Sequence, residues 1–307
     1  MAPKEDITEL GSLEESTSYS KLARLSGLSS EEMVQFKLGW VSLPWQRRRE
    51  IIGRLVELGE DSPDLDFFDV FLACLKDDDD EVKAKAAHGL WESDDRVVIR
   101  PLIGLLANDS SNKVKAAAAT SLGKFATLAQ NRKLHSRDGD RLRDTLLEAI
   151  RRDGQDPTVV RSAIEAVAPL AGPEVDQVIG EAYEDEDLKF KQSALFAMGQ
   201  SSESKWLPKV LQELRHADAA IRYEAVTACG LLGDEATVPD LIDLVEDEDL
   251  QVQLAAINAL GEVGGPLAKR ALAGYLKTGD ETLEEAARDA LANVEFDDDP
   301  LGFRFSK

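Results

Sequence analysis

The chain has 307 residues, with 36 basic and 59 acidic side chains, and its formal net charge of −23 disfavours nucleic acid and anionic membranes as ligands. Two cysteines are too few for a disulfide framework or a cysteine-rich metal site. No stretch is apolar over the roughly 18 to 20 residues that a membrane helix needs, and the first residues lack the apolar core of a signal peptide. We therefore expect a cytoplasmic protein that does not enter a membrane.

The first 63 residues differ from the rest of the chain. Residues 1–18 are polar and acidic, which predicts a disordered leader. In residues 19–63 apolar side chains recur at helical spacing, and a second helix is expected to begin after Pro44, with Ile51, Ile52 and Leu55 facing inward. These helices predict an atypical pair that caps a stack of repeats.

One pattern recurs from residue 64 to residue 294. Its anchor is an apolar residue that follows a helix-capping side chain by three positions and precedes an alanine by four. The anchors are Val82, Val114, Val159, Phe190, Ile221, Val252 and Leu283, and the last five are spaced by 31 residues. A period of this size is typical of repeat proteins, in which a short helix pair buries its apolar stripe against the next copy.

The first helix of each pair is expected between consecutive copies of this pattern. The predicted ranges are 64–76, 96–107, 137–152, 173–184, 204–216, 235–246 and 265–277. The step from Val114 to Val159 is 45 residues, which predicts a longer connection and longer flanking helices there. Residues 295–307 form an acidic tail, in which Phe303 and Phe305 either fold back on the last pair or recognise a partner.

The pattern Asp-x-x-Val-[Arg/Lys]-x-x-Ala-x-x-x-Leu-Gly resembles the HEAT repeat, in the shorter form of the phycobilisome-lyase HEAT-like family. The resemblance implies an all-α fold: a right-handed α-α superhelix, or HEAT-like α-solenoid, of about seven regular helix pairs plus the capping pair. The basic residue after the anchor is present at Lys83, Lys115, Lys191 and Arg222 but is replaced by Val160, Gln253 and Glu284 elsewhere. The glycine nine positions after the anchor is present at Gly123, Gly199, Gly230 and Gly261.

Residues for catalysis are not apparent. The three histidines, His88, His135 and His216, are not followed by glutamate, unlike the iron-binding His-Glu pairs of deoxyhypusine hydroxylase, an enzyme of similar fold. The HEAT-like alkylpurine DNA glycosylases need a basic surface, which this acidic chain lacks. Cys74 and Cys229 occupy apolar helix positions, where a thiol serves as a small core residue. We therefore expect no enzyme activity, no cofactor and no bound metal.

Charged clusters offer two weaker hypotheses. Acidic runs precede the second helices, at Asp77–Glu81, Asp185–Asp187, Asp218 and Asp247–Asp249. Helix capping and solubility explain them best, and docking of a basic partner or of cations is the alternative. Basic residues gather at Arg47, Arg48, Arg49 and Arg54. That cluster could receive an acidic segment, although such a run is more often an exposed helix face.

The second helices of such repeats line the concave side, where a partner binds. The positions two and six after the anchor place His88, Arg161, Gln192, Phe196, Tyr223, Leu254 and Asn258 on one surface. Phe196, Tyr223 and Leu254 come from successive repeats, and a neighbouring Arg222 and Glu224 would form a polar rim. Alternatively, Phe196 fills a groove between helices.

These observations predict a non-catalytic scaffold or adaptor, a monomer, that binds a protein or peptide through Phe196, Arg222, Tyr223, Glu224, Leu254 and Asn258. The alternative is a lyase-type or enzyme-accessory subunit that assists cofactor attachment to a target protein, or its modification.

Overall fold

The computed structural model describes residues 19–91, 93–277 and 279–298, and every regular element in those ranges is a helix. The chain divides into two compact units between Val167 and Ala168. The helices of the first unit are α2 (Tyr19–Ala23), α3 (Ser30–Trp40), α4 (Trp45–Asp61), α5 (Phe68–Cys74), α6 (Asp80–Gly89), the 3-10 helix η1 (Arg96–Val98), α7 (Ile99–Asn108), α8 (Asn112–Gln130), α9 (Ser136–Arg151) and α10 (Pro157–Val167).

The second unit continues the same alternation of helices. It contains η2 (Ala168–Leu170), α11 (Pro173–Tyr183), α12 (Leu188–Gln200), η3 (Ser204–Trp206), α13 (Leu207–Glu213), α14 (Ala219–Leu232), η4 (Glu235–Thr237), α15 (Val238–Leu244), α16 (Leu250–Val263), α17 (Gly265–Tyr275) and α18 (Glu281–Asp298).

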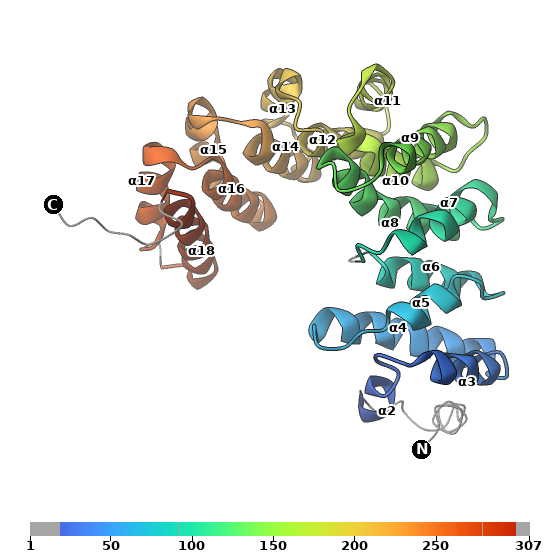
Figure 1. The fold of residues 1–307 in the computed structure, drawn as a ribbon. Coiled ribbons are helices and arrows are strands. Elements are labelled where there is room, and N and C mark those ends of the chain that lie inside the picture. Colours follow the sequence, from blue (N-terminus) through green and yellow to red (C-terminus); the bar gives the residue numbers. More distant parts are fainter. Residues whose placement is uncertain (1–18, 92, 278, 299–307) are drawn as a thin grey trace. The chain divides into compact units, whose positions relative to one another are not determined.

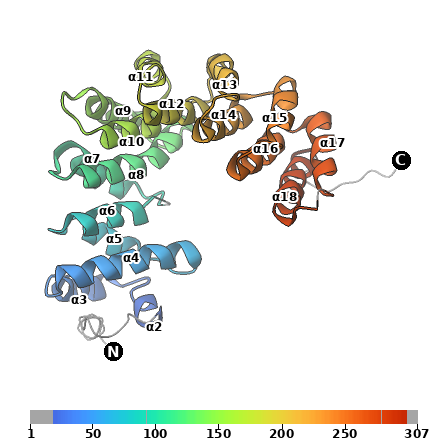
Figure 2. The same ribbon diagram turned by 180° about the vertical axis from the view of Figure 1, so that it is seen from behind.

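Each unit is an α-solenoid made of two helix layers. In the first unit α4, α6, α8 and α10 pack side by side in that order, and in the second α12, α14, α16 and α18 do the same (Figure 1). The first helices of the pairs form the other layer, which Figure 2 shows from behind. Within the described ranges, seven regular pairs run from α5–α6 to α17–α18, and α3–α4 is the atypical first pair. The predicted all-α solenoid is confirmed.

The recurring alanine forms the centre of the core. In all seven copies, the alanine four residues after the anchor is fully buried. Five of the anchors are fully buried as well, whereas Phe190 and Leu283 are half-buried. A small side chain at this position lets the paired helices approach closely while the larger anchors fill the space beside them.

The capping prediction holds for the six aspartates and not for the serine. The carboxylates of Asp79, Asp156, Asp187, Asp218, Asp249 and Asp280 accept hydrogen bonds from backbone N–H groups that open the following helix. Ser111 precedes α8, but its side chain makes no such bond. The acidic residues at these six positions therefore stabilise helix starts, as expected from the positive end of the helix dipole.

The glycine nine residues after the anchor marks the closest approach of neighbouring second helices. A Cβ built on Gly199 would lie 3.0 Å from the Cα of Ala228, and one on Gly230 would lie 2.9 Å from the Cα of Ala259. In each case the partner is the alanine seven residues after the next anchor. Glycine is present because a side chain there would force the two backbones apart.

In several second helices the basic residue that follows the anchor position connects one repeat to the next. Arg48 of α4 contacts Asp77 at 2.6 Å, and Lys83 of α6 contacts Asp109 at 2.5 Å, each aspartate lying in the turn of the next pair. Arg222 and Asp247 repeat the arrangement in the second unit. The aspartate also accepts the backbone N–H two residues further on, as Asp247 does from Asp249 at 2.9 Å. One carboxylate therefore shapes a turn and ties two repeats together.

The long step between Val114 and Val159 is accommodated by helices. α8 spans 19 residues and α9 spans 16, so the expectation of longer flanking helices is confirmed. The connection between them is only residues 131–135, and the predicted longer connection is wrong. A helix accommodates extra residues while pairing their backbone groups within itself, whereas a loop must pair them with water or with other segments.

The two ends of the chain lie partly outside the described residues. The predicted leader, residues 1–18, is outside them, as are residues 299–307 of the predicted tail. Residues 295–298 belong to α18. The domain boundaries proposed at residues 64 and 294 stay predictions.

Candidate partner-binding surface

The surface predicted from the sequence lies on α12, α14 and α16 of the second unit. Phe196 and Tyr223 are 37% and 39% exposed, which is unusual for large aromatic side chains in helices that are otherwise buried on two sides. Leu254 is half-buried and Asn258 is exposed. These four side chains, from three successive second helices, therefore all reach the solvent.

A surface cleft of about 370 Å³ lies between the exposed side chains of α14 and those of α16. Tyr223, Thr227 and Leu231 form one wall from α14, spaced at one turn each. The opposite wall, from α16, consists of Leu254, Asn258 and Glu262. We call these six side chains and the space between them the α14–α16 groove.

The groove exists because its floor is made of small residues. Gly230 and Ala259 touch at the bottom, and Ala255 lies beside them. The two helices are thereby close enough to share one trough, while the larger side chains stand on both sides of it. The exposed Leu231, 47% accessible, was missed by the sequence analysis because it lies ten residues after the anchor.

Arg222 does not lie at the rim of this groove. It is only 6% exposed, and its guanidinium pairs with Asp247 through two short contacts, Nε to Oδ2 at 2.8 Å and Nη2 to Oδ1 at 2.7 Å. Its Nη1 donates to the carbonyl oxygens of His216 and Ala217. The hydrogen bonds from Arg222 hold the pKa of the Asp247 carboxyl below its usual range. Arg222 therefore fixes the base of α14, while the half-buried Glu224 stays on the surface.

The N-terminal arginines also have structural roles. Arg47 is only 2% exposed, so the arginine run is not simply an exposed face of α4. It lies three residues after Pro44, as the anchors of the other second helices lie three residues after their capping side chains. Arg48 pairs with Asp77 and Asp78, and Arg49 pairs with Asp79 at 2.8 Å. These ion pairs join α4 to the turn before α6. Most of the positive charge of the cluster is therefore engaged by carboxylates of the protein itself.

The side chains that most often bind metals or act as nucleophiles can be located in the described residues. No three or more His, Cys, Asp or Glu side chains in those ranges are arranged to hold a metal ion. Burial raises the pKa of the Cys229 thiol to about 11 and that of Cys74 well above its usual value, so neither forms a thiolate readily. His216 accepts the backbone N–H of Asp218 through Nδ1. In the described ranges no helix is both long and apolar enough to cross a membrane.

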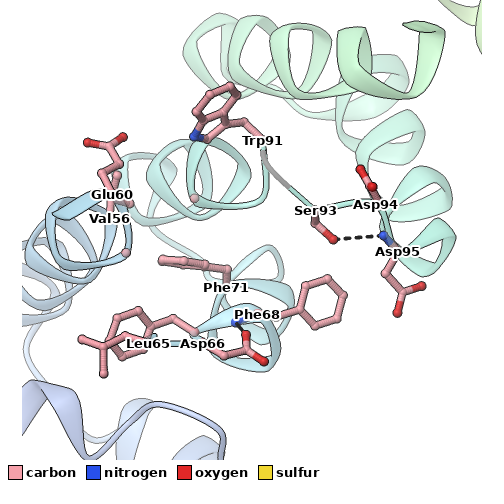
Figure 3. Close-up of a pocket in the computed structure, with 13 residues that line it drawn as sticks. Val56, Glu60, Leu65, Asp66, Phe68, Phe71, Trp91, Ser93, Asp94 and Asp95 are labelled. Carbon is pink, nitrogen blue, oxygen red and sulfur yellow. Dashed lines mark hydrogen bonds between the residues drawn. The ribbon is translucent and has the colours of Figure 1, made fainter. Parts of the chain in front are cut away.

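A second cleft, of about 500 Å³, lies in the first unit and was not predicted (Figure 3). The end of α4 contributes Glu60, α5 contributes Phe68 and Phe71, and the turn after α6 contributes Trp91. Figure 3 shows Trp91 at one end of the cleft, Glu60 on one side, and Asp94 and Asp95 on the opposite side. We call this space the Trp91 cleft. One feature of the sequence could have indicated this cleft: Trp91 stands nine residues after Val82, at a position where four other copies have glycine.

Stacked helix pairs with a buried alanine, a capping aspartate and a cation that reaches the next turn define an α-solenoid repeat protein. The HEAT-repeat family model matches this chain over residues 68–135 and 207–292, which together make up half of the chain. The chain belongs to the HEAT-repeat family. No curated protein matches it.

Several solved structures are similar in fold to this chain. A chain of the complex of CpcE and CpcF of phycocyanin lyase from Nostoc sp. is 16% identical to this chain, with a TM-score of 0.49. The match covers 74% of this chain and 94% of the other. Human deoxyhypusine hydroxylase in complex with glycerol is 19% identical, covers 86% and 96%, and has a TM-score of 0.38. A karyopherin bound to RanGDP is 13% identical, covers 95% and 45%, and has a TM-score of 0.48.

Proposed function

We propose that this protein is a non-catalytic adaptor, cytoplasmic and monomeric, that binds a protein partner on α12, α14 and α16. The observation that supports this most directly is the α14–α16 groove, where Tyr223 and Leu231 stay exposed beside a cleft although the helices around them are well packed. Exposed large apolar side chains that border a cleft are typical of sites where a partner inserts an anchor residue.

The partner that fits this groove is a short amphipathic segment with apolar anchors and basic flanks. The apolar walls, Tyr223, Leu231 and Leu254, would contact the anchors. Glu262 lines the groove on a protein with a net charge of −23, which favours basic residues around those anchors. Phe196, on the neighbouring α12, would extend the apolar contact by one repeat.

A lyase-type accessory subunit, which assists cofactor attachment to a target protein or its modification, is the competing function. The two functions differ in what accompanies the protein through purification. An accessory subunit of this kind would carry a visible chromophore or another small molecule, whereas an adaptor would retain a polypeptide. An absorbance spectrum of the purified protein, together with mass spectrometry under native conditions, separates them.

We predict that Tyr223→Ala combined with Leu254→Ala weakens binding of a captured partner by at least about tenfold, because removal of anchor contacts of this kind typically costs 1 kcal/mol or more each. The partner is first identified by affinity capture from the native cell and mass spectrometry. The dissociation constant is then measured by calorimetry with the purified partner, for the wild type and for the double variant.

Leu188→Ala combined with Leu250→Ala is the matched control. Both leucines are exposed, at 41% and 46%, and each lies at the start of a second helix, outside the residues that line the groove. This control is expected to bind like the wild type. The groove assignment is wrong if the control weakens binding as much as the test variant, or if the test variant binds normally. Loss of helical circular dichroism in the test variant would show that Tyr223 and Leu254 are core residues.

A further inference from the structure

The Trp91 cleft exists because α6 ends early. α14 and α16 continue for 11 residues after their anchors, whereas α6 ends at Gly89, seven residues after Val82. The last turn that other second helices have is therefore missing, and the chain turns away through Trp91. The volume which that turn would occupy stays open between the ends of α4, α5 and α6.

Aromatic rings form the inner surface of this cleft. Phe71 is buried and lies directly under Gly89, where an added Cβ would come within 2.6 Å of the phenylalanine ring. Phe67 packs against Phe71 edge to face, with the ring centroids 6.2 Å apart. Trp91, 45% exposed, lies at the open end. Gly89 is therefore required for the position of Phe71, and the cleft has a rigid aromatic base.

The charged groups that line the cleft are all acidic. Glu60, Asp66, Asp94 and Asp95 are on its wall, and no arginine or lysine is among the described residues that line it. Two of these carboxylates accept backbone hydrogen bonds at helix starts: Asp66 accepts the N–H of Phe68, and Asp95, which caps η1, accepts that of Val97, each at 2.9 Å. Outside the lining, Lys124 contacts Asp94 at 2.9 Å and His88 contacts Glu60 at 3.5 Å. The wall thus combines fixed negative charge with aromatic surface.

Three rings of this protein, one exposed and two buried, have its own cations close to them. The guanidinium of Arg49 lies 4.5 Å from the ring centre of Trp45, and Lys205 lies 5.5 Å from that of Trp206. Tyr183 has two lysines near its ring. Within the described part of the chain, no basic side chain lies over Trp91, although carboxylates face the same space. The chemistry that this site complements is therefore a cation on an aliphatic stem.

We propose that the Trp91 cleft receives the arginine or lysine side chain of a basic peptide segment in a partner protein. The aliphatic stem would lie along Phe68 and Phe71, and the charged head would reach Trp91 and the carboxylate of Glu60. This site is in the first unit, and it does not depend on the α14–α16 groove. Either site can be correct when the other is wrong.

The test uses the full chain and a blocked hexapeptide in which three arginines alternate with alanines. The indole N–H signals of the four tryptophans are followed by NMR, and Trp91→Phe identifies the signal of Trp91. We expect the peptide to shift that signal. A peptide with citrulline in place of arginine, which keeps the shape without the charge, is expected to bind at least about tenfold more weakly. Spermidine, with three charges but no peptide backbone, is expected to bind more weakly than the arginine peptide.

Trp91→Ala and Glu60→Gln are each expected to weaken binding of the arginine peptide several-fold. Glu60→Gln decides the outcome if Trp91→Ala alters the fold, because Glu60 is half exposed and its replacement leaves the packing intact. Trp45→Ala is the matched control, since Trp45 is equally exposed but already carries Arg49, and it should bind the peptide like the wild type. The proposal is overturned if the citrulline peptide or spermidine binds as tightly as the arginine peptide, or if Trp45→Ala is the variant that loses binding.

Discussion

Asp247→Asn is expected to lower the free energy of unfolding of the second unit by about 3 kcal/mol, the size of effect found when one partner of a buried ion pair is removed. Arg222 and Asp247 have side chains only 8% and 7% exposed, so the arginine charge would remain buried without its carboxylate. Asparagine keeps an oxygen that can accept the N–H of Asp249, which preserves the turn. Urea unfolding followed by circular dichroism measures the change.

Glu248→Gln is the matched control for this variant. Glu248 also contacts Arg222, at 3.4 Å, but its side chain is 85% exposed. A solvent-exposed pair contributes about 0.5 kcal/mol or less, so the control should unfold almost like the wild type. Equal losses for the two variants would mean that burial of the Arg222–Asp247 pair is not what stabilises the contact between the two repeats.

The same pair makes a prediction about acid. The pKa of Asp247 is lowered in the folded protein, mainly by the hydrogen bonds from Arg222. The pair therefore contributes its full stabilisation above the pKa of an unfolded aspartate, about 4, and this contribution is lost as the pH falls through the lower folded pKa. Between pH 5 and pH 2, roughly, the stability of Asp247→Asn should fall less steeply than that of the wild type. Parallel profiles would contradict this.

Gly230→Ala is expected to destabilise the second unit by about 1 to 3 kcal/mol, because an extra methyl group at a tight contact forces the helices apart. The new Cβ would lie 2.9 Å from both the Cα and the Cβ of Ala259, and backbone atoms cannot rotate away. The helix preference of alanine over glycine, about 1 kcal/mol, opposes this loss but does not exceed it. The measurement is again the free energy of unfolding in urea.

Gly274→Ala, in α17, is the same chemical change without the contact. Nothing lies within 4 Å of the Cβ that would be added there. Helix preference alone then acts, and the variant should be as stable as the wild type or more stable, by up to about 1 kcal/mol. A similar loss in both variants would show that the Gly230 effect does not come from the contact with Ala259.

The sequence predicted the repeat, its helix pairs and most of its helix caps, because these depend on residues close together in the chain. The buried position of Arg222 was not predictable in the same way. Helical spacing places it next to the exposed Tyr223, and only the turn 25 residues later, with Asp247, decides that it points inward. The Trp91 cleft was missed because its shape depends on where α6 ends and on three other segments that meet there.

The inter-repeat ion pair is not repeated at the next step. Gln253 stands in α16 where Arg222 stands in α14, and its amide donates to the carbonyl oxygen of Asp247 in its own repeat. In the described residues, the last pair, α17–α18, packs on α16 through contacts such as that of Gly261 with Ala290, without the Arg–Asp clamp that joins α14 to α16. Fraying of the stack should begin at α17–α18, so that the α14–α16 groove remains formed after the last pair has opened.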